Sequence, residues 1–206
     1  MIIVHHLNNS RSQRILWLLE ELGVPYDIQH YQRDAVTSLA PPELKAVHPL
    51  GKSPIVTDQG EILAESGMII DVLSRRYGPH LAVDPSSRDY PTYLHWLHFA
   101  EGSAMLPFLL ALYTSRLGEA AAPLQPRIQA EIMNHMTYVE SYLEGRDYFV
   151  GAQLTGADIQ MSFVGDIAKG NGLLAMLPNL RAWVERIHAR PQWQVALEKG
   201  GPYRFA

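Results

Sequence analysis

Two short segments of this 206-residue chain carry groups that together could hold a peptide-like ligand with carboxylates. Lys52 lies in a loop rich in proline and glycine, His48–Val56, and supplies a cation for a carboxylate. Ile55 follows at a position where the edge of a strand would offer its N–H and C=O to such a ligand. The alternative interpretation is an ordinary turn that enters a strand.

The second segment is Glu65-Ser66, directly before an apolar helical pattern. Ser66 is therefore expected to be a helix N-cap, and the amides at such a helix start favour an anionic carboxylate. A plain cap would explain Ser66 taken alone. Its distance in sequence from Lys52 favours a carboxylate-binding pair instead.

Composition excludes several kinds of chemistry. The chain has no cysteine, which removes disulfides, thiolate metal sites and a sulfur nucleophile of the protein's own. Any thiol chemistry here needs a thiol that arrives with a ligand.

Charge and hydropathy restrict the partners and the location. Lys plus Arg number 17 against 21 for Asp plus Glu, a net charge of −4 without long runs of one sign, so we expect no nucleic-acid partner. No apolar run approaches the roughly 20 residues that span a bilayer, and no signal peptide is recognised after Met1–His6. We expect a soluble, cytoplasmic protein with no membrane partner.

The first part of the chain predicts a βαβ unit, a hairpin and a helix. Leu18, Leu19 and Leu22 have helical spacing between two short strand patterns, and Gly23 ends that helix. The expected elements are strands at Met1–His6 and Tyr26–Tyr31, a hairpin of 54–57 with 61–63, and a helix at Ser66–Tyr77.

The second part predicts helices only. The segment 80–89 contains Pro85 and mixed charges and is taken as a linker between domains at 1–79 and 90–206. The expected helices are Tyr90–Arg116, bent near Pro107, then Pro126–Glu144, Thr155–Lys169 with a capping box of Thr155 and Asp158, and one around Leu180–Ile187. The predicted fold class is α/β plus all-α, with a thioredoxin-like domain followed by a helical bundle.

One face of the helix at Tyr90–Arg116 combines apolar and ionisable side chains. A regular helix places Leu94, Leu97, His98, Glu101 and Met105 on this face. A buried, mutually satisfied pair of His98 and Glu101 is one interpretation. A metal site with His95 is disfavoured, because offsets of three and six residues spread the side chains around the helix.

The chain resembles the cytosolic glutathione transferases over nearly its whole length. The similarity is most specific at His48–Val56, followed by Glu65-Ser66. The stretch Asn8–Glu21 is most similar to bacterial and fungal members and to the Ser-type pattern. No tyrosine precedes the first helix, which departs from the Tyr-type classes.

The resemblance implies roles for the first domain. Lys52, Ser53 and the Glu65-Ser66 pair bind glutathione, Ile55 pairs with its cysteinyl backbone, and Pro54 follows a cis peptide bond. Glutathione is then a co-substrate, and no cofactor or metal is expected.

The resemblance also implies a hydroxyl donor to the glutathione sulfur at the start of the first helix. A free thiol has a pKa of about 8.5, which such a donor and a helix N-terminus should lower. Ser10 lies four residues before Arg14, the Ser-type spacing, while the amide of Asn9 is a competitor. Both also suit simple capping. Arg11 beside them faces either the ligand or water.

For the second domain, the resemblance implies a homodimer and a pocket for the second substrate. Glu101 would reach the glutathione amino group across the dimer, and Trp96, Phe108 and Tyr113 would contact a hydrophobic electrophile. The implied activity is conjugation of reduced glutathione to small hydrophobic electrophiles, in detoxification. The alternatives are a glutathione-dependent disulfide reductase or peroxidase and a non-catalytic binding module of the same fold.

Overall fold

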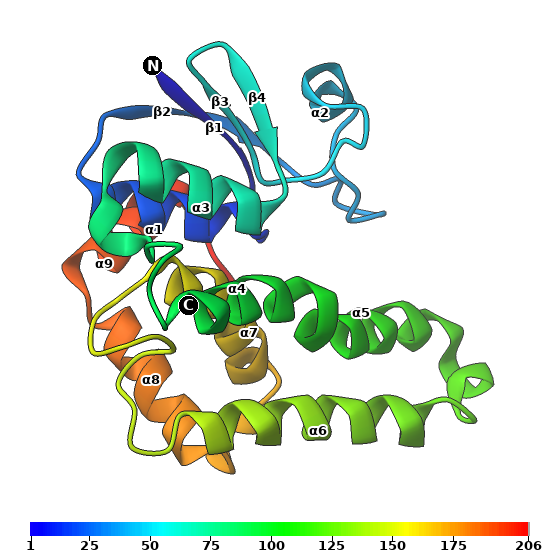
Figure 1. Ribbon diagram of the computed structural model, residues 1–206. Coiled ribbons are helices and arrows are strands. Elements are labelled where there is room, and N and C mark those ends of the chain that lie inside the picture. Colours follow the sequence, from blue (N-terminus) through cyan, green and yellow to red (C-terminus); the bar gives the residue numbers. More distant parts are fainter. Residues whose placement is uncertain (206) are drawn as a thin grey trace. The chain divides into compact units, whose positions relative to one another are not determined.

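The computed structural model describes residues 1–205 and divides them into two compact units (Figure 1). The first unit contains residues 1–85 together with the chain from Arg186 onward, and the second contains residues 86–185. This division differs from the predicted helical domain of 90–206 in its last part. Ala206, the final residue of that prediction, lies outside the described residues.

The first unit is built on a four-stranded sheet in the order β2-β1-β3-β4. Strand β1 is parallel to β2 and antiparallel to β3, which is antiparallel to β4. This arrangement confirms the predicted thioredoxin-like domain. Its elements are β1 (Ile2–Leu7), α1 (Ser12–Leu22), β2 (Tyr26–Tyr31), α2 (Glu43–Val47), β3 (Ile55–Asp58), β4 (Glu61–Ala64), α3 (Ser66–Tyr77) and α9 (Pro191–Gly200).

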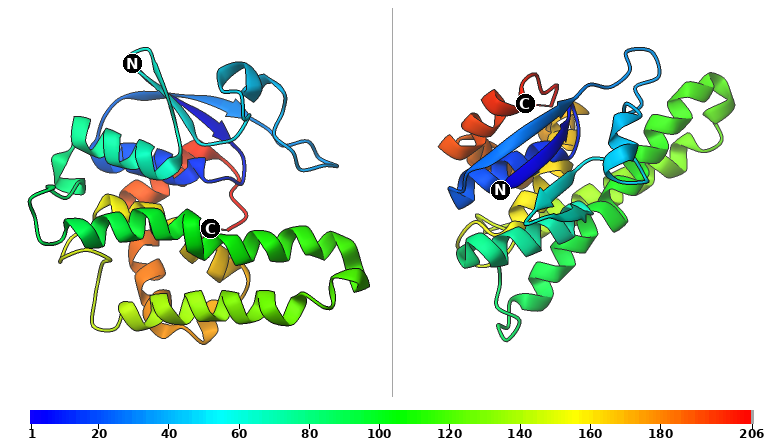
Figure 2. Two further views of the ribbon diagram at one scale, coloured as in Figure 1. Left: turned by 45° about the vertical axis from the view of Figure 1, so that its right-hand side comes forward. Right: turned by 90° about the horizontal axis from the view of Figure 1, so that it is seen from above.

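The alternation of side chains along β1 decides what each face of the sheet buries. Figures 1 and 2 show α1 and α3 together on one face of the sheet. Val4 and His6, which alternate along β1 and so share one face, are both buried. On the other face Leu7 and Ile55 pack with Leu44 of α2. Helix α1 ends at Gly23, whose φ of 64° is the left-handed conformation that favours glycine.

Helix α9, which the sequence did not predict as part of the first unit, packs against α1. Trp193 meets Trp17 edge-to-face with 5.1 Å between the ring centroids, and both are fully buried. The carboxylate of Glu21 accepts hydrogen bonds from the guanidinium of Arg190. Aromatic burial with a paired charge beside it explains why this segment leaves the helical unit.

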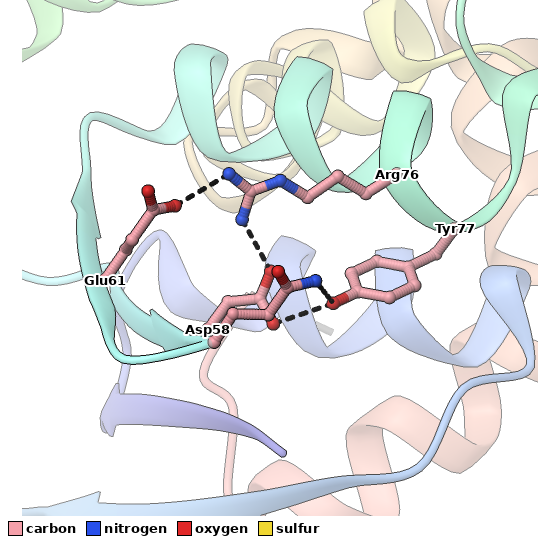
Figure 3. A network of polar contacts seen from close by, with 5 residues as sticks. Asp58, Glu61, Arg76 and Tyr77 are labelled. Carbon is pink, nitrogen blue, oxygen red and sulfur yellow. Dashed lines mark hydrogen bonds and ion pairs between the residues drawn. The ribbon is translucent and has the colours of Figure 1, made fainter.

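A polar network ties the β3–β4 hairpin to the last turn of α3 (Figure 3). Arg76 bridges the carboxylates of Asp58 and Glu61 at 2.8 Å and 2.7 Å, and Tyr77 donates to Asp58 at 2.7 Å. Asp58 is buried, so removing its partners would leave a desolvated charge. The network therefore fixes the hairpin, and with it the start of β3, relative to α3.

The second unit is helical, as predicted. It contains α4 (Tyr90–Phe99), a π-helical turn (Ala100–Ala104), α5 (Met105–Thr114), α6 (Gln125–Tyr142), α7 (Gly156–Gly170) and most of α8 (Pro178–His188). Helices α5 and α6 pack side by side. Within residues 1–205, no helix is long and apolar enough to cross a bilayer.

The π-helical turn corrects the expected single face of the helix at Tyr90–Arg116. A wider turn just before Pro107 relieves the clash of the proline ring with the carbonyl four residues earlier, so the chain continues as α5. The extra residue shifts the register by about 100°. His98, which precedes the turn in α4, is exposed, while Leu97 and Met105 on either side of the turn are buried, so no buried pair of His98 and Glu101 forms.

The capping box at the start of α7 is confirmed, with Thr155 as N-cap. Asp158 also accepts hydrogen bonds from the Phe149 N–H at 2.9 Å and from the Trp183 indole at 3.1 Å. Burial raises the pKa of Asp158 to about 6, although these hydrogen bonds oppose the shift. The residue therefore joins three segments of the unit in addition to capping the helix.

We expect Asp158→Asn to change how stability depends on pH. The folded-state pKa of about 6 lies above the usual 3.9, so the folded chain keeps a proton that the unfolded chain releases between these values. This contribution is present below about pH 4 and lost as the pH rises through about 6. Urea unfolding of parent and variant at both ends of this window should show the parent losing stability relative to the variant; parallel curves would contradict the prediction.

Candidate functional site

The loop between β1 and α1 meets the loop before β3. Ser10 is buried, and its Oγ lies 2.8 Å from Ser12 Oγ and 3.4 Å from Ser53 Oγ. Ser10 Oγ also accepts the Ser12 N–H at 3.2 Å, so it supports the start of α1 as a capping residue would. Ser10 and the Lys52–Ile55 segment, far apart in sequence, are thus brought together.

The Ser53–Pro54 peptide bond is cis, as the resemblance implied. Ser53 Oγ donates to the His5 carbonyl at 3.1 Å, which holds this loop to the end of β1. Lys52 before it is exposed, with its charge available at the surface. Gly51 has a φ of 57°, and a Cβ there would lie 2.7 Å from the Lys45 side chain. The loop is therefore tightly folded and presents Lys52 outward.

The expected backbone role of Ile55 is corrected by the register of the sheet. Ile55 lies opposite His5 of β1 and opposite Ala64 of β4. A residue of an inner strand points its N–H and C=O at one of its two neighbours, so Ile55 has no open edge. Ser53 precedes the paired residues and is the position of this segment whose backbone can meet a ligand.

Ser66 lies at the first residue of α3, and Glu65 occupies the N-cap position with a φ of 72°. The expectation that Ser66 is the N-cap is therefore wrong by one residue. Its hydroxyl instead accepts a hydrogen bond from Arg14 Nη2 at 2.8 Å. Arg14 is buried on α1, so its guanidinium and the first amides of α3 place positive charge around Ser66. The arrangement suits a carboxylate.

Asn9 has a different environment from Ser10. Its backbone is left-handed, with a φ of 51°, and its Oδ1 accepts the backbone N–H of Arg204 at 2.9 Å. The loop is tied in this way to the C-terminal segment. Asn9 thus uses its side-chain oxygen for structure, which leaves the amide NH₂ as its donor group.

Arginine side chains surround this loop. Arg33 donates from Nε to the Asn8 carbonyl at 3.1 Å. Its pKa is lowered by burial first and then by the like charges of Arg11 and Arg204. Repulsion of this kind is relieved by an anion, so the surroundings of this loop suit a negatively charged ligand group.

The predicted electrophile-contacting residues of the second unit differ in exposure. Trp96 is fully buried in an aromatic cluster with Tyr142 and Phe149, at 4.6 Å between ring centroids in each pair, and offers no surface to a substrate. Phe108 is nearly buried, whereas Tyr113 is 60% exposed. Glu101 is half-buried in the π-helical turn. Trp96 is thus better explained as core.

A shallow hollow of about 350 Å³ lies on the surface of this unit. It is lined by Leu94, His95, His98, Phe99, Gly102 and Ser103. His95 Nε2 lies 3.1 Å from the hydroxyl of Tyr138. Among residues 1–205, no three His, Asp or Glu side chains gather closely enough to hold a metal ion.

Sequence reasoning missed three residues that position the site. Arg14 served only as a spacing marker, yet it supports Ser66. His6 and Ser12 form a buried contact at 2.9 Å beneath Ser10. The alternation of β1 contained a signal for His6, because it follows Ile2 and Val4 on the core-facing side.

Comparison with known proteins agrees with this geometry. The family models "Glutathione S-transferase, N-terminal domain" and "Glutathione S-transferase, C-terminal domain" match residues 1–75 and 87–191. Glutathione S-transferase 3 of Schizosaccharomyces pombe is 38% identical, covering 97% of this chain and 88% of that protein. This chain belongs to the glutathione S-transferase family.

Further relatives extend over the full length. Glutathione S-transferase 1 of Saccharomyces cerevisiae is 30% identical, covering 97% of this chain and 95% of the relative. A crystal structure of a glutathione S-transferase from Actinobacillus pleuropneumoniae superposes with a TM-score of 0.90 at 36% identity, covering 99% of this chain and 94% of that one. Single relatives therefore match both the first and the second half of this chain.

We expect Arg14→Met to lower the free energy of unfolding by roughly 2 kcal/mol and to weaken glutathione binding. The substitution removes a buried hydrogen bond from a charged donor and the positive charge beside Ser66. Chemical denaturation and calorimetric titration measure the two effects. The control is Arg127→Met, because Arg127 is 79% exposed on α6. Unchanged affinity in Arg14→Met would contradict the assignment.

Proposed function

We propose that this glutathione transferase conjugates reduced glutathione to small hydrophobic electrophiles in the cytoplasm, as a detoxification enzyme. The observation that carries the proposal is the convergence of Ser10, Ser53 and the cis bond before Pro54 in the unit that also contains the Arg14–Ser66 pair. Membership of the transferase family supports the activity.

The proposed mechanism assigns each end of glutathione to a separate group. Lys52 and the start of α3 at Ser66 bind the carboxylates, and the backbone of Ser53 meets the cysteinyl residue. Ser10, or Asn9 as the competitor, then donates a hydrogen bond to the sulfur and favours the thiolate that attacks the electrophile. The nucleophile is the ligand's own thiolate, so this chemistry needs no metal or prosthetic group.

We further propose a homodimer in which Glu101 reaches the amino group of glutathione bound to the partner subunit. Phe108 and Tyr113 are the proposed contacts for the electrophile. The exposure of Tyr113 supports such a contact, whereas the burial of Trp96 removes it from the set.

The two alternative functions are less well supported. Relatives at 38% and 30% identity are named as transferases, which favours transfer over a reductase or peroxidase role. The assembled carboxylate-binding groups speak against a purely non-catalytic module, since a scaffold has no need of them.

Calorimetric titration with reduced glutathione and an assay with a generic aromatic electrophile test the proposal. We expect Ser66→Ala to weaken binding. Ser10→Ala should bind nearly normally but lose about tenfold to a hundredfold in kcat/KM, the range for one hydrogen bond to a charged atom.

Asn9→Ala is the matched comparison for Ser10→Ala, because it alters the adjacent donor in the same loop. A loss confined to Asn9→Ala would transfer the role to Asn9. Absence of glutathione binding by the parent protein would overturn the proposed function.

A further inference from the structure

A buried chain of hydrogen bonds runs inward from Ser10 to the C-terminal helix. Ser10 Oγ is 2.8 Å from Ser12 Oγ, which is 2.9 Å from Nδ1 of His6. Nε2 of the same imidazole lies 3.1 Å from the carbonyl oxygen of Gly200. Ser10, Ser12 and His6 are each at most 4% exposed, so water does not compete for these contacts.

The last contact fixes the tautomer of His6. A carbonyl oxygen only accepts, so Nε2 carries the hydrogen that bonds Gly200. Burial, together with the nearby ring of His30, lowers the pKa of His6 to about 4. The imidazole is therefore neutral at physiological pH, and Nδ1 is an unprotonated acceptor.

The tautomer of His6 determines where the hydroxyl hydrogens of Ser12 and Ser10 point. Ser12 donates its hydroxyl hydrogen to His6 Nδ1, the shorter of its options, since the Leu7 carbonyl is 3.3 Å away. Ser12 Oγ is then an acceptor for the hydroxyl of Ser10 at 2.8 Å. The other acceptor near Ser10, Ser53 Oγ, is more distant at 3.4 Å.

We propose that Ser12 and His6 are positioning residues that compete with the ligand for the hydroxyl hydrogen of Ser10 and hold it inward until a thiolate is present. The inference rests on the proposed function, in which Ser10 contacts the glutathione sulfur. In this state Ser10 accepts from a thiol. It donates to a thiolate only after its hydroxyl rotates away from Ser12 and gives up a buried hydrogen bond.

The consequence is a thiol that is less acidic than Ser10 alone would make it. Removing the inward acceptor should free the Ser10 hydrogen for the sulfur and lower the pKa of the bound thiol. One hydrogen bond of ordinary strength corresponds to a shift of about half a unit to one unit.

The test measures the pKa of bound glutathione from the ultraviolet absorbance of its thiolate in parent, Ser12→Ala and His6→Leu. Ser12→Ala removes the acceptor directly. His6→Leu removes the partner of Ser12, whose hydrogen then turns to Ser10 Oγ at 2.8 Å, which is nearer than the Leu7 carbonyl at 3.3 Å, and frees the hydrogen of Ser10. We expect a lower thiol pKa in both variants, and no such shift when Ser10→Ala is added.

Ser162→Ala is the control, because Ser162 is an equally buried serine on α7 that donates to its own helix. General loss of packing would weaken binding without acidifying the thiol, so it does not imitate the expected result. Circular dichroism shows whether Ser12→Ala or His6→Leu fails to fold. If one of them does, the thiol pKa measured in the other tests the positioning role.

The two levels of inference fail differently. If the parent binds glutathione and Ser10→Ala raises the thiol pKa, but the folded Ser12→Ala and His6→Leu proteins leave it unchanged or raise it, the positioning role is overturned alone. If the parent does not bind glutathione, the proposed function fails and this inference falls with it.

Discussion

The first turn of α1 is the element on which the rest of the first unit depends. Ser10 and Ser12 are bonded there to the loop before β3 and to His6 of β1, while Arg14 reaches the start of α3. Most of these groups are buried, and a buried polar group without its partner costs about 1–3 kcal/mol. Each contact therefore constrains the others, and the loop, the helix start and the cis bond take up one arrangement.

The C-terminal segment completes this arrangement from the far end of the chain. Gly200 accepts from His6, and the backbone of Arg204 donates to Asn9. The stacking of Trp193 on His188, at 4.5 Å between centroids, and its edge-on contact with Trp17 anchor α9 against α1. A segment that follows the helical unit in sequence thus contributes to the geometry of the loop that begins α1.

In the proposed site, the surrounding charge and the direction of the Ser10 hydrogen bond have opposite effects on the acidity of the glutathione sulfur. The arginines around Asn8 and the start of α1 favour an anion at the site. In the proposed arrangement, the inward bond of Ser10 competes with that anion for the same hydrogen. The acidity of the bound thiol then depends on this balance as well as on the residue type at position 10.

Local patterns in the sequence determined much of the fold. Periodicity located β2, α3 and α6 almost to the residue, and the Thr155–Asp158 box marked the start of α7, because these features depend on neighbours within a few positions. The resemblance at His48–Val56 and Glu65-Ser66 indicated the family and the cis bond.

Only the tertiary structure decided which of the indicated groups can act. Ile55 is closed by strands on both sides, Trp96 is enclosed by aromatic rings, and the π-helical turn rotates one part of a long helix relative to the other. The direction of the Ser10 hydrogen depends on a carbonyl that lies 194 residues from His6 in the chain. Contacts between residues so distant in sequence depend on packing and desolvation across the whole unit, and no local sequence pattern encodes them.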